Sequence, residues 1–507
     1  MVSARTQRVL QIAVNFGAAL TVVACMELVS RRVERLKIER EPATFRRLPP
    51  KGGSEVRVFA FGGSTVWGGP VPEVGFVAQM QYWLQRLYPD RDIRIYNFGW
   101  SALDTRFVLD QLTRRLADQP DLIIVITGGN EFLRQDPEGQ IAHIQNALSM
   151  HVATFRLLEW GIRKVMKPRS PVVPCQLVPW DRESASFKSK VGAFEKSMNL
   201  IATRTRQRGI KLILGTLPSN MADWPPVYKR LGGRAQRYYE TVSRIQELLR
   251  NQEYGGASDA VAAGFSVYGQ DAMLYFLRGK IQFAMGAYAD ARESFVKARD
   301  LDPFPARAPS LINAVIRKVA SGIPGVYLVD LEKAYEEHSK GGLIGFDLVA
   351  DQVHGTPLGE STTAQAIIQT MIEIGTLPPS PNVQQECCPV GIFLAHVGYL
   401  EPKSPLHLRA LLHGATEAMK IPFLHYEISR MYLLEAVDVD ANSWEAWANL
   451  ATLSYFAGDA AAGARELRRA TELHHAPLDV DDRSATPYLK QALEYSAGRT
   501  NGCGGPP

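Results

Sequence analysis

The chain has 507 residues, of which 46% are hydrophobic and 21% charged, so it is long enough for two or three domains with their own cores. The net charge of +5 arises in residues 1–50, which hold nine Lys or Arg and four Asp or Glu, whereas the remainder holds 48 of each sign. A neutral body lacks the positive stripe of a nucleic-acid groove, and we expect no nucleic-acid partner.

The amino-terminal region has the length and hydropathy of a membrane anchor. Residues 10–29 are mostly apolar, with Gln11, Asn15 and Glu27 as exceptions, and about 20 residues suffice to cross a bilayer. We expect a single-pass signal-anchor (transmembrane) helix there; a buried amphipathic helix is the alternative. More Lys and Arg residues follow this stretch than precede it, which by itself favours a body in the cytoplasm.

The cysteines give two further options. Val22-Val-Ala-Cys25 is similar to a bacterial lipoprotein cleavage box, which would make Cys25 the lipidated first residue, although we favour an uncut span. A bond from Cys175 to Cys387 or Cys388 is the second option. No cysteine spacing is of the zinc-binding type, so we expect neither a metal nor a cofactor.

Five strand-like runs follow, with helical patterns between several of them, for instance at residues 74–87 and 105–117. Near-continuous apolar strands alternating with helices predict an α/β fold, a three-layer α/β/α arrangement around a five-stranded parallel sheet. The predicted strands are residues 56–61, 92–98, 122–127, 210–217 and 326–330.

Polar residues follow three of these strands. Gly62-Gly63-Ser64 comes directly after the first, where a sharp strand-to-helix turn can present a hydroxyl. Asn130 follows the third strand. Asp351 and His354 are three residues apart, so the carboxylate can hold the imidazole in the tautomer that faces a hydroxyl. Taken singly, each has a structural alternative: a turn, a helix cap or a hydrogen-bonded pair in a loop.

In combination, these segments resemble the sequence blocks of the SGNH (GDSL-like) hydrolases. Gly62-Gly63-Ser64-Thr65 is similar to block one, with Gly63 where many members have Asp. Residues 97–105 are similar to block two, residues 128–131 to block three and residues 351–354 to block five. The resemblance covers roughly residues 55–225 and 322–375 and implies a flavodoxin-like domain.

The resemblance implies a site for acyl transfer. Ser64 would be the nucleophile, His354 the base and Asp351 the residue that orients it. The N–H groups of Ser64 and Ala102 and the amide of Asn130 would bind the oxyanion. Ala102 stands where the family has glycine, and the alternative alignment makes Gly99 the donor. We expect the other histidines to be surface or packing residues: His143, His151, His338, His396, His407, His413, His425, His474 and His475.

Two further regions surround this domain. The loop after the fourth strand offers Asn220 and Trp224 as substrate contacts, unless they only form the turn. Residues 272–303 and 444–470 resemble tetratricopeptide (TPR) repeats, which would act as a brace or as a surface for a protein partner. The first match rests on Leu277, Gly279, Tyr288, Ala291, Phe295, Ala298 and Pro303, and the second on residues 444–458 with Ala464, Leu467 and Ala470.

The expected function is that of a membrane-anchored serine esterase whose substrate is an acyl ester, with an O-acetylated saccharide as the candidate. Transfer of the acyl group to a polysaccharide and a non-catalytic scaffold are the alternatives. Resemblance to envelope-facing members favours a bacterial-type inner membrane with a periplasmic catalytic domain. The expected segments are a basic amino terminus (1–9), the span (10–29), a linker (30–54), the catalytic domain (55–225 and 321–376), its helical insertion (226–320), a second linker (377–392), repeat helices (393–480) and a tail (481–507).

Overall fold

The structure is a computed structural model that describes residues 25–30, 48–133, 179–227, 235–379, 387–420, 425–475, 478, 486 and 488–497. One compact unit, Lys51–Leu133 with Val173–Pro507, contains every element discussed below. The other unit, Met1–Pro50 with Arg134–Val172, is described only at residues 25–30 and 48–50.

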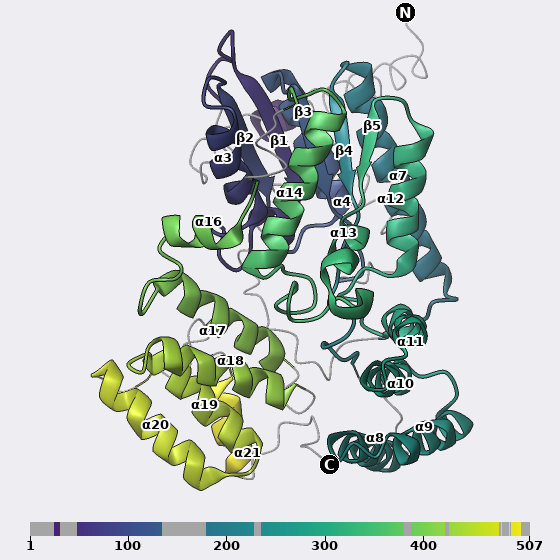
Figure 1. Cartoon of the computed structure of the whole chain (residues 1–507), viewed down its shortest axis with the longest axis vertical. Coiled ribbons are helices and arrows are strands. Elements are labelled where there is room, and N and C mark those ends of the chain that lie inside the picture. Colours follow the sequence, from purple (N-terminus) through teal and green to yellow (C-terminus); the bar gives the residue numbers. More distant parts are fainter. Residues whose placement is uncertain are drawn as a thin grey trace, which may run out of the picture. The chain divides into compact units, whose positions relative to one another are not determined.

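A five-stranded parallel sheet forms the core of the α/β part of this unit, in the order β2-β1-β3-β4-β5 (Figure 1). All four pairings are parallel, and β1 pairs with both β2 and β3. The prediction of five parallel strands is confirmed, with boundaries within two residues of those expected. The strands are β1 (Val56–Gly62), β2 (Ile93–Gly99), β3 (Leu122–Ile126), β4 (Lys211–Gly215) and β5 (Val326–Val329).

Two groups of helices cover the sheet. Helices α3 (Phe76–Leu87) and α14 (Pro357–Glu373) contact each other, and α4 (Thr105–Arg115), α7 (Ala185–Gln207) and α12 (Ser310–Gly322) form the other group. The central strands are closed from water on both sides: β3 is buried along its whole length. This burial explains why β3 reads as a continuous apolar run.

The chain between β4 and α12 forms a helical insertion: α8 (Ala235–Arg250), α9 (Tyr254–Tyr268), α10 (Ala272–Ala284) and α11 (Tyr288–Leu301). These helices share one hydrophobic core. Gly279 on α10 allows close packing, since a Cβ there would lie 2.7 Å from the Phe295 ring on α11. The helix pair expected from residues 272–303 is present, and its assignment to the tetratricopeptide family stays a prediction.

A second set of helices follows the sheet domain, with a core built mainly from α17, α18 and α19. Neighbours in sequence pack together, as in the pairs α17 with α18 and α19 with α20. Besides α14, the described α-helices after β5 are α13 (Leu331–His338), α16 (Val390–His396), α17 (Pro405–Met419), α18 (Tyr426–Val439), α19 (Trp444–Phe456), α20 (Ala460–His474) and α21 (Leu489–Ser496).

The predicted membrane span lies outside the described residues except for residues 25–29. Within the described ranges, no helix combines the length and hydropathy that crossing a bilayer requires. Cys175 also lies outside them, and Cys387 bonds its neighbour Cys388. That bond corrects the expected pairing with Cys175.

Candidate active site

The turn after β1 holds Ser64 at the carboxyl edge of the sheet. Helix α2 (Ser64–Trp67) begins at this serine directly after Gly62 and Gly63. A Cβ on Gly62 would lie 2.1 Å from the carbonyl oxygen of Ile126, and one on Gly63 would lie 2.8 Å from Asn130 Nδ2. Position 62 therefore requires glycine, because its close neighbour is backbone, whereas a side chain at position 63 would have to displace the Asn130 amide.

Two short hydrogen bonds connect Ser64, His354 and Asp351. Ser64 Oγ lies 2.7 Å from His354 Nε2, and His354 Nδ1 lies 2.6 Å from Asp351 Oδ2. The other carboxylate oxygen, Oδ1, accepts the backbone N–H groups of Val353 and His354. The structure thus brings together the three side chains that the sequence singled out, from segments almost 300 residues apart.

Asp351 and His354 shift each other's pKa in opposite directions. Burial acts to raise the pKa of Asp351, but the charge of His354 and the hydrogen bonds to the carboxylate outweigh it, and the pKa lies below its ordinary range. Burial likewise acts to lower the pKa of His354, but the Asp351 carboxylate outweighs it and holds this pKa above its usual value. Asp351 is ionised at neutral pH and favours a proton on the imidazole.

The predicted oxyanion donors differ in how free their N–H groups are. Gly99 donates its backbone N–H to Asn97 Oδ1 at 2.8 Å, so the alternative alignment loses its donor. Ala102 adopts the left-handed conformation with φ of 59°, which costs an alanine about 1–2 kcal/mol. In the described part of the chain, no carbonyl accepts the backbone N–H of Ala102 or Ser64. Asn130 Nδ2 donates one hydrogen to the carbonyl of Leu103 and keeps a second one.

A cavity of about 60 Å³ opens beside Ser64 and Asn130. The end of β3 and the loop after β4 form part of its wall, together with side chains from α3 and α13. Ala306 and Ala308, in the segment that joins the insertion to α12, also line the cavity. The segment that directly follows the helical insertion therefore forms part of the cavity wall.

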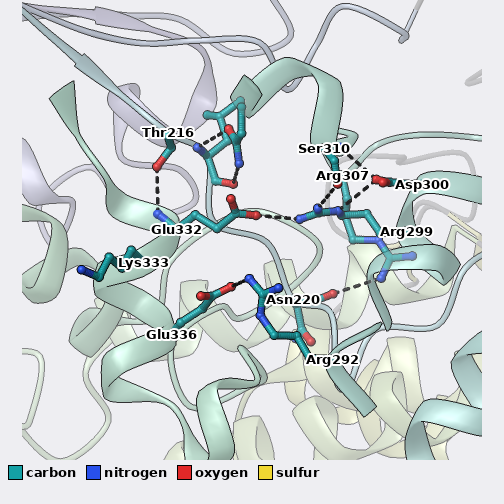
Figure 2. A network of polar contacts seen from close by, with 12 residues as sticks. Thr216, Asn220, Arg292, Arg299, Asp300, Arg307, Ser310, Glu332, Lys333 and Glu336 are labelled. Carbon is teal, nitrogen blue, oxygen red and sulfur yellow. Dashed lines mark hydrogen bonds and ion pairs between the residues drawn. The ribbon is translucent and has the colours of Figure 1, made fainter. Parts of the chain in front are cut away.

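A buried network fixes this wall (Figure 2). Arg307, between the two alanines, donates to the carbonyl oxygens of Asn220 and Trp224 and pairs with buried Asp302. Arg299 connects Glu332 with Ser310 in the same region. These charges are paired inside the protein, so the segment between α11 and α12 has a defined position relative to the loop after β4.

The expected substrate contacts from Asn220 and Trp224 are corrected by their burial. Asn220 is fully buried, and its side chain bonds the backbone of Val349, Asp223 and Trp224. Trp224 is 3% exposed and packs against His425. Both residues organise the loop, and its residues Leu217 and Pro218 line the cavity in their place.

The sequence interpretation missed two ionisable residues. Glu360 on α14 lines the cavity, accepts the Phe76 N–H, and has its pKa raised to about 7 by burial. His413 on α17, expected to be a surface or packing residue, lies with its ring 5.7 Å from that of His354. No local pattern marks either residue, because each reaches the site through tertiary packing. Within the described ranges, Asp351, His354 and His413 form a group. The carboxylate oxygen and ring nitrogens that they could offer to a metal ion all lie within 4.8 Å of one another.

Comparison with known proteins assigns the family. Residues 58–367, more than half of the chain, match the model of the GDSL-like Lipase/Acylhydrolase family. No curated protein matches the chain.

The solved structures that match this chain share little sequence with it. The acetylxylan esterase Axe2 from Geobacillus stearothermophilus is 16% identical over 65% of this chain and 97% of its own, with a TM-score of 0.31. The α/β hydrolase LAE5 from the metagenome of Lake Arreo, Spain, is 16% identical over 63% and 94%, with a TM-score of 0.29. The matched segment contains every residue of the Ser64 site except His413, and the chain belongs to the GDSL-like Lipase/Acylhydrolase family of ester-hydrolysing enzymes.

Proposed function

We propose that the protein is a serine esterase that cleaves short acyl esters through an acyl-serine intermediate on Ser64. The observation that carries this proposal is the 2.7 Å contact between Ser64 Oγ and His354 Nε2, with Asp351 bonded behind the imidazole. A serine hydroxyl is a weak nucleophile, and an adjacent base with a fixed tautomer is what activates it.

The chemistry divides into two half-reactions. Ser64 Oγ attacks the ester carbonyl carbon, its proton passes to His354 Nε2, and the carbonyl electrons move onto the oxygen. When the tetrahedral species collapses, the C–O bond to the alcohol breaks and His354 returns the proton to the leaving alcohol. Water then attacks the acyl-serine in the same way, which releases the carboxylic acid and restores Ser64.

The developing oxyanion would be bound by three donors: the N–H groups of Ser64 and Ala102 and the second amide hydrogen of Asn130. Support for these roles is that, among the described residues, no acceptor is found for the Ser64 and Ala102 N–H groups or for the second Asn130 amide hydrogen, and that Ser64 and Asn130 line one cavity. Each such donor is typically worth about 2.7–4 kcal/mol of barrier.

The size of the cavity favours a small acyl group. A volume of about 60 Å³ accommodates a few water-sized groups, which is room for an acetyl group. Arg307 anchors the segment that carries Ala306 and Ala308, because it donates to two carbonyl oxygens of the loop after β4. An O-acetylated saccharide is the substrate we put forward, with transfer to a saccharide hydroxyl as the alternative fate of the acyl-serine.

A membrane anchor at residues 10–29 and a periplasmic location are part of the same proposal and rest on the sequence. A role of the α10–α11 and α19–α20 helices in binding a protein partner, as tetratricopeptide repeats do, is proposed on the same basis.

The test compares the hydrolysis of p-nitrophenyl acetate, butyrate and octanoate by the wild type and by Ser64→Ala. We expect the acetate ester to be the best substrate and Ser64→Ala to lose at least about 10³-fold in kcat/KM. Ser258→Ala on α9 removes a serine remote from the site and serves as the control. Equal hydrolysis by Ser64→Ala and the wild type would overturn the proposal, and no hydrolysis by the wild type would favour a scaffold. With acetylated xylan and an unacetylated acceptor, free acetate indicates hydrolysis and an acetylated acceptor indicates transfer.

A further inference from the structure

Helix α17 brings a second histidine to the Asp351–His354 pair. His413 Nε2 lies 3.9 Å from Asp351 Oδ2, and the two imidazole rings meet edge to face. Helix α18 contacts the same loop, since Tyr432 donates its hydroxyl to the carbonyl of Ala350. Both helices lie beyond the residues matched by the family model, which end at 367.

The surroundings of His413 determine which nitrogen carries its proton. Nε2 is buried and has no hydrogen-bond partner within the described residues. It lies between two carboxylates, 3.9 Å from Asp351 Oδ2 and 3.8 Å from Glu417 Oε1. Ionised carboxylates only accept hydrogen bonds, so a proton on Nε2 is favoured over a lone pair there. Burial lowers the pKa of His413, so at neutral pH the ring is a neutral donor.

The Asp351 carboxylate has room for one more donor. Such a group offers about four acceptor sites. Three are filled, by the N–H groups of Val353 and His354 and by His354 Nδ1. His413 Nε2 faces the oxygen that holds the imidazole. Glu417 competes for this N–H less strongly, because its carboxylate is already paired with Lys420.

We propose that His413 is a positioning residue of the esterase site, which donates from α17 to Asp351 and keeps that carboxylate aimed at His354 during attack by Ser64. The inference rests on the proposed function. The 3.9 Å separation is longer than a hydrogen bond, and such contacts commonly shorten when substrate binds. The carboxyl-terminal helices thereby complete a site whose other members all lie in the matched domain.

The first experiment separates kcat from KM in His413→Ala, His413→Gln and His407→Ala. We expect His413→Ala to lower kcat about ten- to a hundredfold with KM unchanged, as expected for the loss of one donor to a charged group that matters only in the chemical step. His413→Gln keeps an N–H donor and should recover most of that loss. His407 is the matched control: it lies on the same helix, 3.8 Å from the Glu435 carboxylate, and away from Asp351.

The second experiment is a double-mutant cycle with Asp351→Asn. If His413 acts through Asp351, adding His413→Ala to Asp351→Asn causes no further loss, whereas a general packing defect would multiply the two losses. Wild-type kcat in His413→Ala, or multiplied losses, would overturn the inference.

The same variants are compared in their rate of Ser64 labelling by a fluorophosphonate, which needs no acyl substrate. Labelling that depends on Ser64 without ester hydrolysis would contradict the proposed esterase, and the labelling rates would still decide the role of His413. No labelling of the wild type would overturn both.

Discussion

Ser64, His354 and Asp351 form a relay in which each side chain sets the state of the next. The base must be neutral to accept the serine proton, and the Asp351 carboxylate holds the pKa of His354 above its ordinary value of 6.5. Activity is therefore absent where the imidazole is protonated and appears as the pH rises through this raised pKa.

We predict that kcat/KM of the wild type rises with a midpoint above pH 6.5. In Asp351→Asn, the attraction that raises the pKa is removed and burial lowers it, so the midpoint moves to lower pH. Turnover should fall about 10⁴-fold, because the amide stabilises the wrong tautomer. A pH–rate profile of both proteins, with circular dichroism to verify folding, checks this. Identical midpoints would mean that Asp351 does not control the base.

At the level of single residues, the sequence identified the main residues of the Ser64 site but not the groups that surround them. Ser64, Asn130, Asp351 and His354 each follow a recognisable local pattern, and the structure brings them to one edge of the sheet. Asn220 does not meet the prediction, because a polar side chain in a loop reads the same whether it faces a cavity or bonds buried backbone. His413 was expected to be a surface or packing residue, because its approach to Asp351 is decided by helix packing and leaves no local pattern.

Among the elements, the strands were the most predictable. The run predicted at residues 122–127 is almost entirely apolar, as expected for a strand buried on both faces, and the structure forms β3 at Leu122–Ile126. The helix pair of residues 272–303 in the insertion was predicted from its small residues, which allow two helices to pack closely. Gly279 on α10 is the clearest example, because its Cα faces the Phe295 ring.

We predict opposite effects from two glycine-to-alanine changes in helix interiors. Gly192→Ala on α7 meets no atom within 4 Å and should raise the free energy of unfolding by about 0.5–1 kcal/mol, the usual gain over glycine in a helix. Gly279→Ala places a Cβ 2.7 Å from the Phe295 ring and should lower it by about 1–3 kcal/mol. Thermal and urea unfolding followed by circular dichroism measure both. A stabilised Gly279→Ala would show that α10 and α11 pack less closely than described.

On the scale of the whole molecule, the proposed anchor at residues 10–29 makes the location of the enzyme testable. We predict that the full chain sediments with membranes after a high-salt wash, because burial of about 20 apolar residues is not screened by salt. A chain that starts at residue 48 should be recovered in the soluble fraction with unchanged kcat/KM. Retention of this shorter chain by membranes would contradict the anchor.

The side of the membrane on which the catalytic domain lies can be tested with the same full-length chain. If the catalytic domain is periplasmic, protease added to intact spheroplasts digests it, and if it is cytoplasmic, digestion requires lysis. The count of basic residues around the span favours the second outcome, and the proposed periplasmic location requires the first.

The sequence by itself determined the sheet, the order of its strands along the chain and the residues at the ends of β1 and β3, because burial and tight turns impose composition locally. Only the tertiary structure decided that Arg307 fixes a wall of the cavity, that Asn220 and Trp224 face inward, and that His413 meets Asp351. These relations join elements far apart in the chain. They depend on how helices and loops pack, and a contact of that kind leaves no periodic trace in either of the segments that make it.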